Sequence, residues 1–241
     1  MVSEAAPFVG GGATTDYRES AAHTDPTAEP VAAQILRSML RAARLLDPVE
    51  VQEQLDRAAA AFGIARCVDD IVMPATRRLR RLLANGEQTT AQHLLAIESL
   101  RTWLSHRASF APAPLSIGPI VLACGPRDRD TVGMESLALL LRFRRVPCRV
   151  LGARVTPFTL TMAAQAADAM GVIVMASDIR RLPQAVVSLQ AAHALDLPVF
   201  FSGPAFALEG SRLDLPGQYL GVRLGLGCTI VVDTVLMGLQ R

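Results

Sequence analysis

The sequence contains no lysine, and all 24 of its basic residues are arginine. This absence excludes a Schiff-base lysine, a phosphate-binding P-loop lysine and a lysine general base. The chain also lacks the Gly-x-Ser-x-Gly turn of hydrolases and the Gly-x-Gly-x-x-Gly turn of dinucleotide-binding proteins. No catalytic constellation is therefore visible, and we expect a protein that is not an enzyme.

Cysteines are few and widely separated. Cys67, Cys124, Cys148 and Cys228 form no Cys-x-x-Cys pair, and Cys124 and Cys148 lie in apolar runs. We therefore expect the cysteines to be buried free thiols in a reducing, cytoplasmic compartment. No cluster of His, Cys, Asp and Glu has zinc-binding spacing, so no metal site is predicted. A signal peptide and an apolar stretch of membrane-spanning length are both missing, so no membrane contact is expected.

Composition indicates a folded chain. Of the 241 residues, 51% are hydrophobic and 19% are charged, and the net charge is +2. That length is enough for one large or two small domains with a sizeable core. The nearly balanced charge argues neither for nor against nucleic-acid binding.

The first half of the chain predicts a helical bundle. Residues 1–29 are polar, rich in small residues and without periodicity, which predicts a disordered tail. Residues 30–107 show the spacing of amphipathic helices. Asp47 and Pro48 are typical of a helix start, and Gly63 is typical of a helix end. Four helices are expected, from residue 30 to about residue 46 and over residues 48–62, 65–85 and 89–105, with a possible kink at Pro74.

The second half predicts an α/β domain of the flavodoxin or Rossmann-like type. Residues 108–118 contain prolines and a glycine and are expected to be a linker. Within residues 119–241, apolar runs alternate with helical segments, which is typical of a parallel sheet covered by helices on both faces. A ligand crevice should lie at the carboxyl ends of the strands. Five strands are predicted at 119–124, 148–151, 171–176, 198–202 and 218–220, and helices at 131–145, 157–169, 181–195 and 224–239.

The loop after the first predicted strand carries a resemblance to a known family. The stretch from Asp128 to Gly133 resembles the Asp-x-His-x-x-Gly loop of cobalamin-binding domains, in which the histidine is the lower cobalt ligand. Asp130 stands at the histidine position in this sequence. Ser177 matches the serine after the family's third strand, and Gly203 lies in a stretch that resembles the glycine motif after the fourth.

The order of bundle and α/β domain is similar to the cobalamin-binding module of light-sensing transcriptional regulators of the CarH/LitR type. It is also similar to stand-alone regulators of the AerR type and to corrinoid modules of methyltransferases. The resemblance implies a sensor or regulator that binds a corrinoid, haem or bilin between the two halves, or that works through protein contacts without a cofactor. A regulatory protein partner is then expected, direct DNA binding is not, and a homo-oligomer stays open. The alternative is a corrinoid carrier in a methyltransferase system.

Two helical residues resemble the family's upper-face motif. The family places a tryptophan and then Glu-His above the corrin, and here Gln92 and His93 stand at the Glu-His positions while Leu82 or Leu83 replaces the tryptophan. His93 is either an axial ligand or, as we favour, a half-buried structural histidine. Asp130 is either a ligand or hydrogen-bonding group, or, as we favour, an acid that caps the following helix. The candidate cofactor-binding residues are therefore Gln92, His93, Asp128, Asp130, Gly133, Ser177 and Gly203.

A run of four arginines lies in the third predicted helix, at positions 77, 78, 80 and 81. Such a run can bind nucleic acid or an acidic partner. The apolar residues between the arginines keep an inward stripe, so the favoured interpretation is a solvated helix face.

Overall fold

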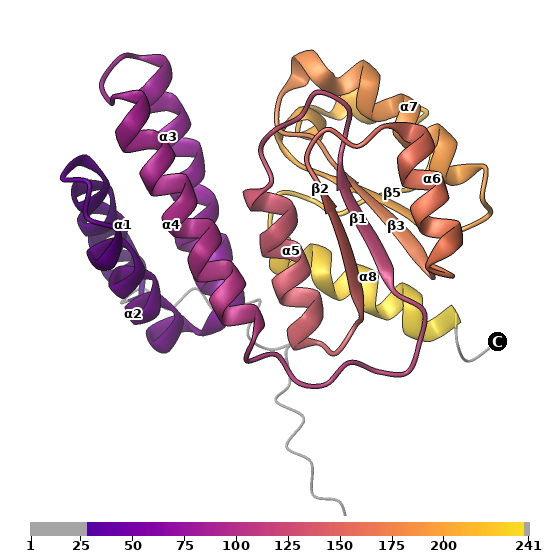
Figure 1. Ribbon diagram of the computed structural model, residues 1–241, viewed down its shortest axis with the longest axis horizontal. Coiled ribbons are helices and arrows are strands. Elements are labelled where there is room, and N and C mark those ends of the chain that lie inside the picture. The colour runs from indigo at the N-terminus through magenta and orange to yellow at the C-terminus, as the bar shows by residue number, and fades with distance from the viewer. Residues whose placement is uncertain (1–27, 239–241) are drawn as a thin grey trace, which may run out of the picture.

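The computed structural model describes residues 28–238 and shows a helical bundle beside an α/β domain (Figure 1). The tail predicted over residues 1–29 lies outside the described residues, except that residues 28 and 29 already belong to the first helix. The bundle (residues 28–108) consists of α1 (Ala28–Arg44), α2 (Pro48–Cys67), α3 (Met73–Ala84) and α4 (Thr90–Ala108).

The turn between α1 and α2 forms as its sequence predicts. The side chain of Asp47 accepts hydrogen bonds from the backbone N–H groups of Val49 and Glu50, at 3.1 and 3.0 Å. Pro48 occupies the first helical turn, where its missing N–H leaves no hydrogen bond unmade. This capped start fixes where α2 begins.

The break predicted at Gly63 is present, and the helix predicted over residues 65–85 contains a π-helical turn that was not predicted. Gly63 interrupts the helix with a φ of 78°, as expected of a break, but helical structure resumes at once and α2 ends at Cys67. A π-helical turn, η1 (Val68–Val72), then leads directly into α3. Pro74 lies in the first turn of α3, directly after this π-helical turn. The irregularity belongs to η1, which faces the α/β domain.

The core of the bundle surrounds the single tryptophan. Trp103 on α4 is buried, and its indole N–H donates a hydrogen bond of 2.6 Å to Asp56. Val132 and Leu139 of the α/β domain pack into the same cluster, so the two halves share apolar contacts.

A five-stranded parallel sheet forms the centre of the α/β domain (residues 120–238), as predicted. Its strand order is β2-β1-β3-β4-β5. Every residue of β1 and β3 is buried, which accounts for their uninterrupted apolar sequences. The strands are β1 (Ile120–Cys124), β2 (Cys148–Gly152), β3 (Gly171–Met175), β4 (Val199–Ser202) and β5 (Gln218–Tyr219).

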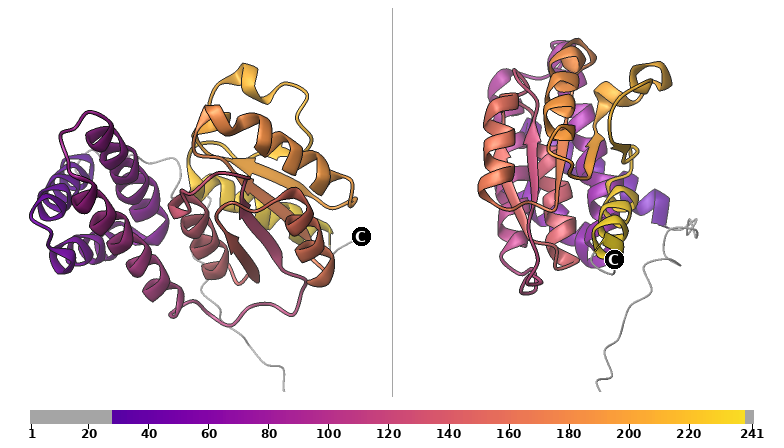
Figure 2. Two further views of the ribbon diagram at one scale, coloured as in Figure 1. Left: turned by 45° about the horizontal axis from the view of Figure 1, so that its top comes forward. Right: turned by 90° about the vertical axis from the view of Figure 1, so that its right-hand side faces the viewer.

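Helices cover both faces of the sheet (Figures 1 and 2). α5 (Val132–Phe143) and α8 (Leu224–Gly238) pack on one face, and α6 (Pro157–Ala166) and α7 (Leu182–His193) on the other. Three short 3₁₀ turns, η2 (Ile179–Arg181), η3 (Pro204–Phe206) and η4 (Glu209–Arg212), lie in the loops after β3 and β4. Within the described residues, no helix has the length and apolarity needed to cross a membrane.

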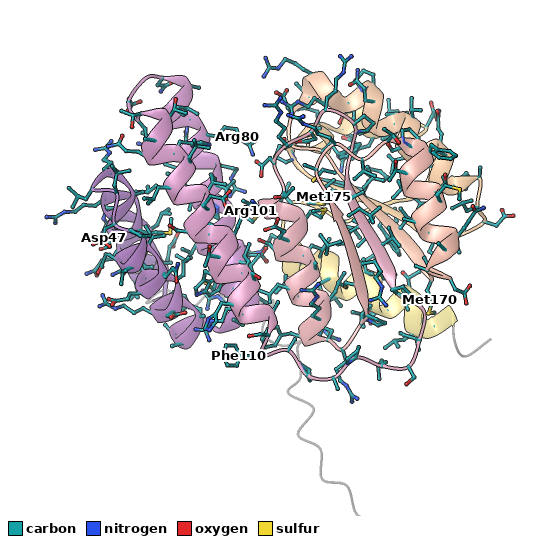
Figure 3. The ribbon with its side chains drawn as sticks, in the orientation of Figure 1. Asp47, Arg80, Arg101, Phe110, Met170 and Met175 are labelled. Atoms are coloured by element: carbon teal, nitrogen blue, oxygen red, sulfur yellow. The ribbon has the colours of Figure 1, made fainter. Side chains whose placement is uncertain are left out.

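The bundle docks beside the carboxyl edge of the sheet. α4 packs along α5, where Arg101 and Glu135 form an ion pair at 3.0 Å. Figure 3 shows Arg80 and Arg101 on the side of the bundle that faces the α/β domain. The bundle therefore lies along α5, and its helix α3 stands next to the edge at which α/β proteins bind ligands (Figure 1).

Candidate functional site

A cleft of about 420 Å³ lies between the bundle and the carboxyl edge of the sheet. The bundle contributes Met73, Thr76, Arg77 and Arg80 to its wall, and Asp69 from η1. The α/β domain contributes residues from the loops after β1, β3, β4 and β5 and from the first turn of α5: Asp130, Gly133, Ser177, Gly203 and Arg223. Four of the seven predicted site residues are thus brought to one place.

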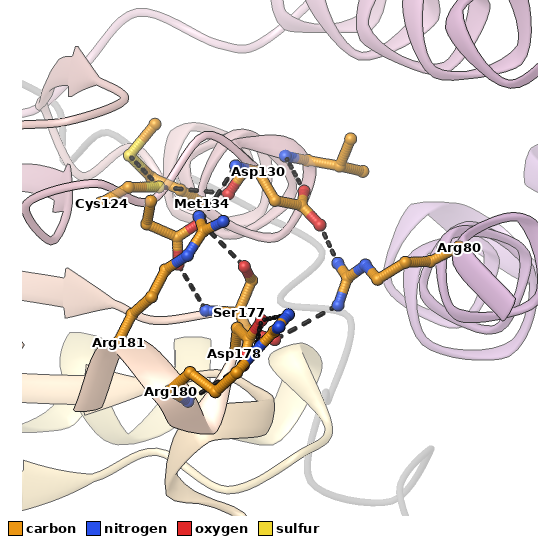
Figure 4. Close-up of polar contacts among 10 residues, drawn as sticks. Arg80, Cys124, Asp130, Met134, Ser177, Asp178, Arg180 and Arg181 are labelled. Atoms are coloured by element: carbon orange, nitrogen blue, oxygen red, sulfur yellow. Dashed lines mark hydrogen bonds and ion pairs between the residues drawn. The ribbon is translucent and has the colours of Figure 1, made fainter. Parts of the chain in front are cut away.

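An ion pair crosses this cleft. The guanidinium of Arg80 on α3 pairs with the carboxylate of Asp130 in the loop after β1, and it also donates a hydrogen bond of 3.2 Å to the carbonyl oxygen of Ser177 (Figure 4). The side chains are 41% and 22% exposed, so the pair is partly screened by solvent. Burial lowers the pKa of Arg80, while Asp128 and Asp178 oppose that shift.

Asp130 also caps α5. Its second carboxylate oxygen accepts a hydrogen bond of 3.2 Å from the backbone N–H of Val132, the first residue of the helix. This contact agrees with the favoured prediction that Asp130 is an acid at the start of a helix. The contact of its other oxygen with Arg80 was not predicted from the sequence.

Asp128 is a buried carboxylate that connects the loops after β1 and β3 through hydrogen bonds. It accepts hydrogen bonds from the backbone N–H and the hydroxyl of Ser177, at 2.6 and 2.8 Å, and from the backbone N–H of Asp130 at 3.0 Å. Arg181 adds an ion pair at 3.2 Å. Asp128 and Ser177 therefore shape the floor of the site by binding to each other.

The two predicted glycines line the cleft for different reasons. A Cβ on Gly203 would lie 2.3 Å from the carbonyl oxygen of Ala176, and its φ is 113°. Packing of the backbone alone thus requires glycine at that position. A Cβ on Gly133 would meet only the methyl ends of Met175 and Met73, at 3.2 and 3.5 Å.

Gln92 and His93, which were predicted to bind a cofactor, are not among the residues that line the cleft. Gln92 forms a capping box with Thr89 at the start of α4 and donates a hydrogen bond of 2.7 Å to the carbonyl oxygen of Arg44. His93 is half-buried, and no hydrogen-bond partner of its Nδ1 occurs among the described residues. Burial lowers the pKa of His93. Gln92 therefore joins the start of α4 to the end of α1.

The donor groups in the cleft do not fit a cobalt ion with a protein imidazole as its lower ligand. Asp130, at the ligand position, is a hard oxygen donor that already binds Arg80 and Val132. Over residues 28–238, no three His, Cys, Asp or Glu side chains are grouped so that they can hold a metal ion. Burial raises the pKa of Cys124, the cysteine beside this loop, to about 12, so its thiol is not a ready ligand either.

Several residues of the cleft were not identified from the sequence. Arg80 was assigned to a solvated face, and Asp69 and Arg223 were not assigned to the site. Met73, Arg77 and Arg80 lie at positions that share one face of a helix, and this spacing was the available signal. That face is separate from the apolar stripe through Leu79 and Leu82, so it was open to contact a second domain.

Comparisons with known proteins agree with this architecture. No protein-family model matches the chain. The HTH-type transcriptional repressor CarH of Myxococcus xanthus is 29% identical over 181 residues, which make up 74% of this chain and 60% of the repressor. This chain therefore spans less than two thirds of the length of that relative.

A match among the solved structures shares the fold over most of both chains. The monomethylamine corrinoid protein of Methanosarcina barkeri matches 84% of this chain and 99% of its own, with a TM-score of 0.64 and 10% identity. A cobalamin-binding protein of Desulfitobacterium hafniense DCB-2 matches 82% of this chain and 97% of its own, with a TM-score of 0.45 and 16% identity. The first likeness shows the fold of a corrinoid protein, and the relative found by sequence is a transcriptional repressor.

Proposed function

We propose that this protein is a non-catalytic sensor and regulator of transcription that holds its ligand in the cleft between the bundle and the α/β domain. One observation carries the proposal: Asp130 replaces the expected cobalt ligand and is paired with Arg80 from the opposite wall. The similarity to a transcriptional repressor supports a regulatory role. The regulator is expected to act through a protein partner.

The ligand is a tetrapyrrole that does not depend on a protein imidazole, or the cleft works through protein contacts alone. A corrinoid bound here would supply a cobalt centre, and the protein's own contribution would be limited to Asp130, Ser177 and the cleft walls. Since Asp130 and Arg80 bind each other across the cleft, a large ring can enter only after this pair separates.

Whether the protein supplies an imidazole ligand to cobalt can be tested with cobinamide, a corrinoid without a nucleotide base. Any nitrogen ligand of its cobalt beyond the four of the corrin ring must come from the protein. We expect the electron paramagnetic resonance spectrum of cob(II)inamide to show no nitrogen splitting with the wild-type protein. The double variant Asp130→His, Arg80→Ala should introduce that splitting, because it provides an imidazole and removes the guanidinium that faces it. Asp196→His, at an exposed position that does not line the cleft, is the matched control.

The regulatory role is tested in the source organism. Deletion of the gene should change the abundance of a defined set of transcripts, and the wild-type gene should restore it while Arg80→Gln should not. Unchanged transcripts after deletion would contradict the proposal. Absorption spectra of the purified protein with haem and biliverdin identify which pigment, if either, binds.

The alternative function is a corrinoid carrier for methyl transfer. The fold shared with the monomethylamine corrinoid protein favours it. Reconstituted protein would then accelerate methyl transfer from methylcobalamin to a thiol acceptor. The absence of such transfer, together with a changed transcript profile, would favour the regulator.

A further inference from the structure

We propose that the cleft recognises a carboxylate attached to an apolar body, and that the ligand's carboxylate replaces Asp130 as the partner of Arg80. This inference rests on the proposed function because it uses the same cleft, and it specifies the chemistry that the cleft selects. Asp130 then acts as an internal competitor, which the ligand must displace.

The surroundings of the cleft carry an excess of positive charge. Arg77, Arg80 and Arg223 line the cleft. The loops after β1, β2 and β3, at the same edge of the sheet, add five more arginines, although the whole chain has a net charge of only +2. These five arginines are Arg127, Arg129, Arg154, Arg180 and Arg181. A concentration of one sign of charge around a cleft raises the local concentration of oppositely charged ligands.

The aspartates of this region neutralise only half of that charge, because they pair with four of the eight arginines. Asp69 caps α8 and contacts Arg223, Asp128 binds Ser177 and Arg181, and Asp178 pairs with Arg180. Asp130 pairs with Arg80. In the ion pairs found over residues 28–238, none involves the side chains of Arg77, Arg127, Arg129 and Arg154. Four exposed guanidinium groups are therefore available to an anion.

The walls of the cleft favour an apolar body on that anion. Met73, Met134 and Met175 face the space together with Pro204 and Leu224. Methionine side chains are flexible and polarizable, so they adapt to ligands of different shape. The cleft volume of about 420 Å³ falls in the range of sites for drug-sized molecules. A small inorganic anion would leave these apolar walls uncovered.

The geometry of Arg80 provides the recognition element. Its guanidinium contacts the Asp130 carboxylate and the Ser177 carbonyl oxygen, and arginine binds carboxylates through a planar fork of N–H groups. The pair with Asp130 is partly exposed, so exchange of one carboxylate for another requires little desolvation. After the exchange, Asp130 keeps its hydrogen bond to the N–H of Val132.

Isothermal titration of the full chain with decanoate tests the inference. We expect decanoate to bind, and 1-decanol and inorganic phosphate to bind at least about tenfold more weakly, because each lacks one of the two features. Titration with 2-naphthoate separates a flat body from a flexible chain, and binding of either carboxylate supports the site. Failure of both carboxylates to bind would overturn it.

Three variants test whether the carboxylate of the ligand binds to Arg80. Arg80→Gln should weaken decanoate binding at least about tenfold, whereas Asp130→Asn should strengthen it about fivefold because the competitor loses its charge. Arg81→Gln, on the exposed part of the same helix, should leave the affinity unchanged. Equal affinity of Arg80→Gln and Arg81→Gln, or weaker binding by Asp130→Asn, would overturn the inference. The transcript test of the regulatory role is independent of these titrations, so the two proposals can fail separately.

Discussion

Asp69 in the π-helical turn of the bundle accepts a hydrogen bond of 2.7 Å from the backbone N–H of Leu224, the first residue of α8. The same carboxylate accepts a second bond from the N–H of Gly225, at 3.2 Å. α8 is thus capped by a residue that lies 155 positions earlier and in the other half of the molecule. Burial raises the pKa of Asp69, while these two hydrogen bonds act against the shift.

Asp69→Ala should lower the free energy of unfolding by about 1–2 kcal/mol, because it removes a helix cap with a favourable charge. Asp70→Ala is the matched control. Asp70 pairs with Arg66 and Arg223 at partly exposed positions, and its loss should cost about 0.5 kcal/mol. Urea denaturation monitored by circular dichroism measures both. Equal losses for the two variants would show that the cap does not stabilise the fold.

Gly203→Ala should be severely destabilising, by about 3 kcal/mol or more, or should prevent folding. The new methyl group would collide with the carbonyl oxygen of Ala176, and the backbone has a positive φ. Gly210→Ala is the control, since a Cβ at that position meets no atom within 4 Å. Its stability should change by about 0.5 kcal/mol or less. A stable, soluble Gly203→Ala protein would contradict the packing argument.

The fold followed from the sequence because its signals are local. The buried strands β1 and β3 are uninterrupted apolar runs, and Asp47 with Pro48 marks the start of α2 within a few residues. Hydrophobic periodicity depends only on neighbours along the chain. The parallel sheet and the helical bundle were predictable for that reason.

The site was only partly predictable because its contacts are distant in sequence. Arg80 and Asp130 lie 50 residues apart and in different halves of the protein. Periodicity identified the face of α3 that points into the bundle, but it does not specify what the opposite face contacts. His93 illustrates the reverse case: its sequence context resembled a ligand motif, yet its helix places it outside the cleft.

Protonation of His93 should destabilise the protein in mildly acidic solution. Burial, and to a smaller extent Arg80, lowers the pKa of His93 in the folded state below its ordinary value of 6.5. The folded state therefore favours the neutral imidazole, so stability is complete above about pH 6.5 and falls as the pH drops towards the lowered pKa. His93→Gln should reduce the difference in unfolding free energy between pH 7.5 and pH 5.5. His193→Gln, at an exposed position, should not.

The four cysteines should be unreactive in the folded protein. Burial raises the pKa of each thiol to about 12, so the reactive thiolate is scarce near neutral pH. Ellman's reagent at pH 8 should label almost no thiol in the native protein and all four in guanidinium chloride. Rapid labelling of a single cysteine before unfolding would show that its surroundings open locally.

The ion pair between Arg80 and Asp130 should couple the two halves of the protein energetically. In a double-mutant cycle with Arg80→Gln and Asp130→Asn, we expect a coupling free energy of about 0.5–1 kcal/mol, typical of a partly exposed pair. Asparagine retains an oxygen for the N–H of Val132, so the cap on α5 is kept while the charge is removed. The coupling should decrease between 0.05 and 0.5 M salt, because about tenfold more ions shorten the range of electrostatic attraction. A zero or salt-independent coupling would mean that Arg80 is held by its bond to the Ser177 carbonyl and not by charge, and Asp130 could then not act as a competitor for an anionic ligand.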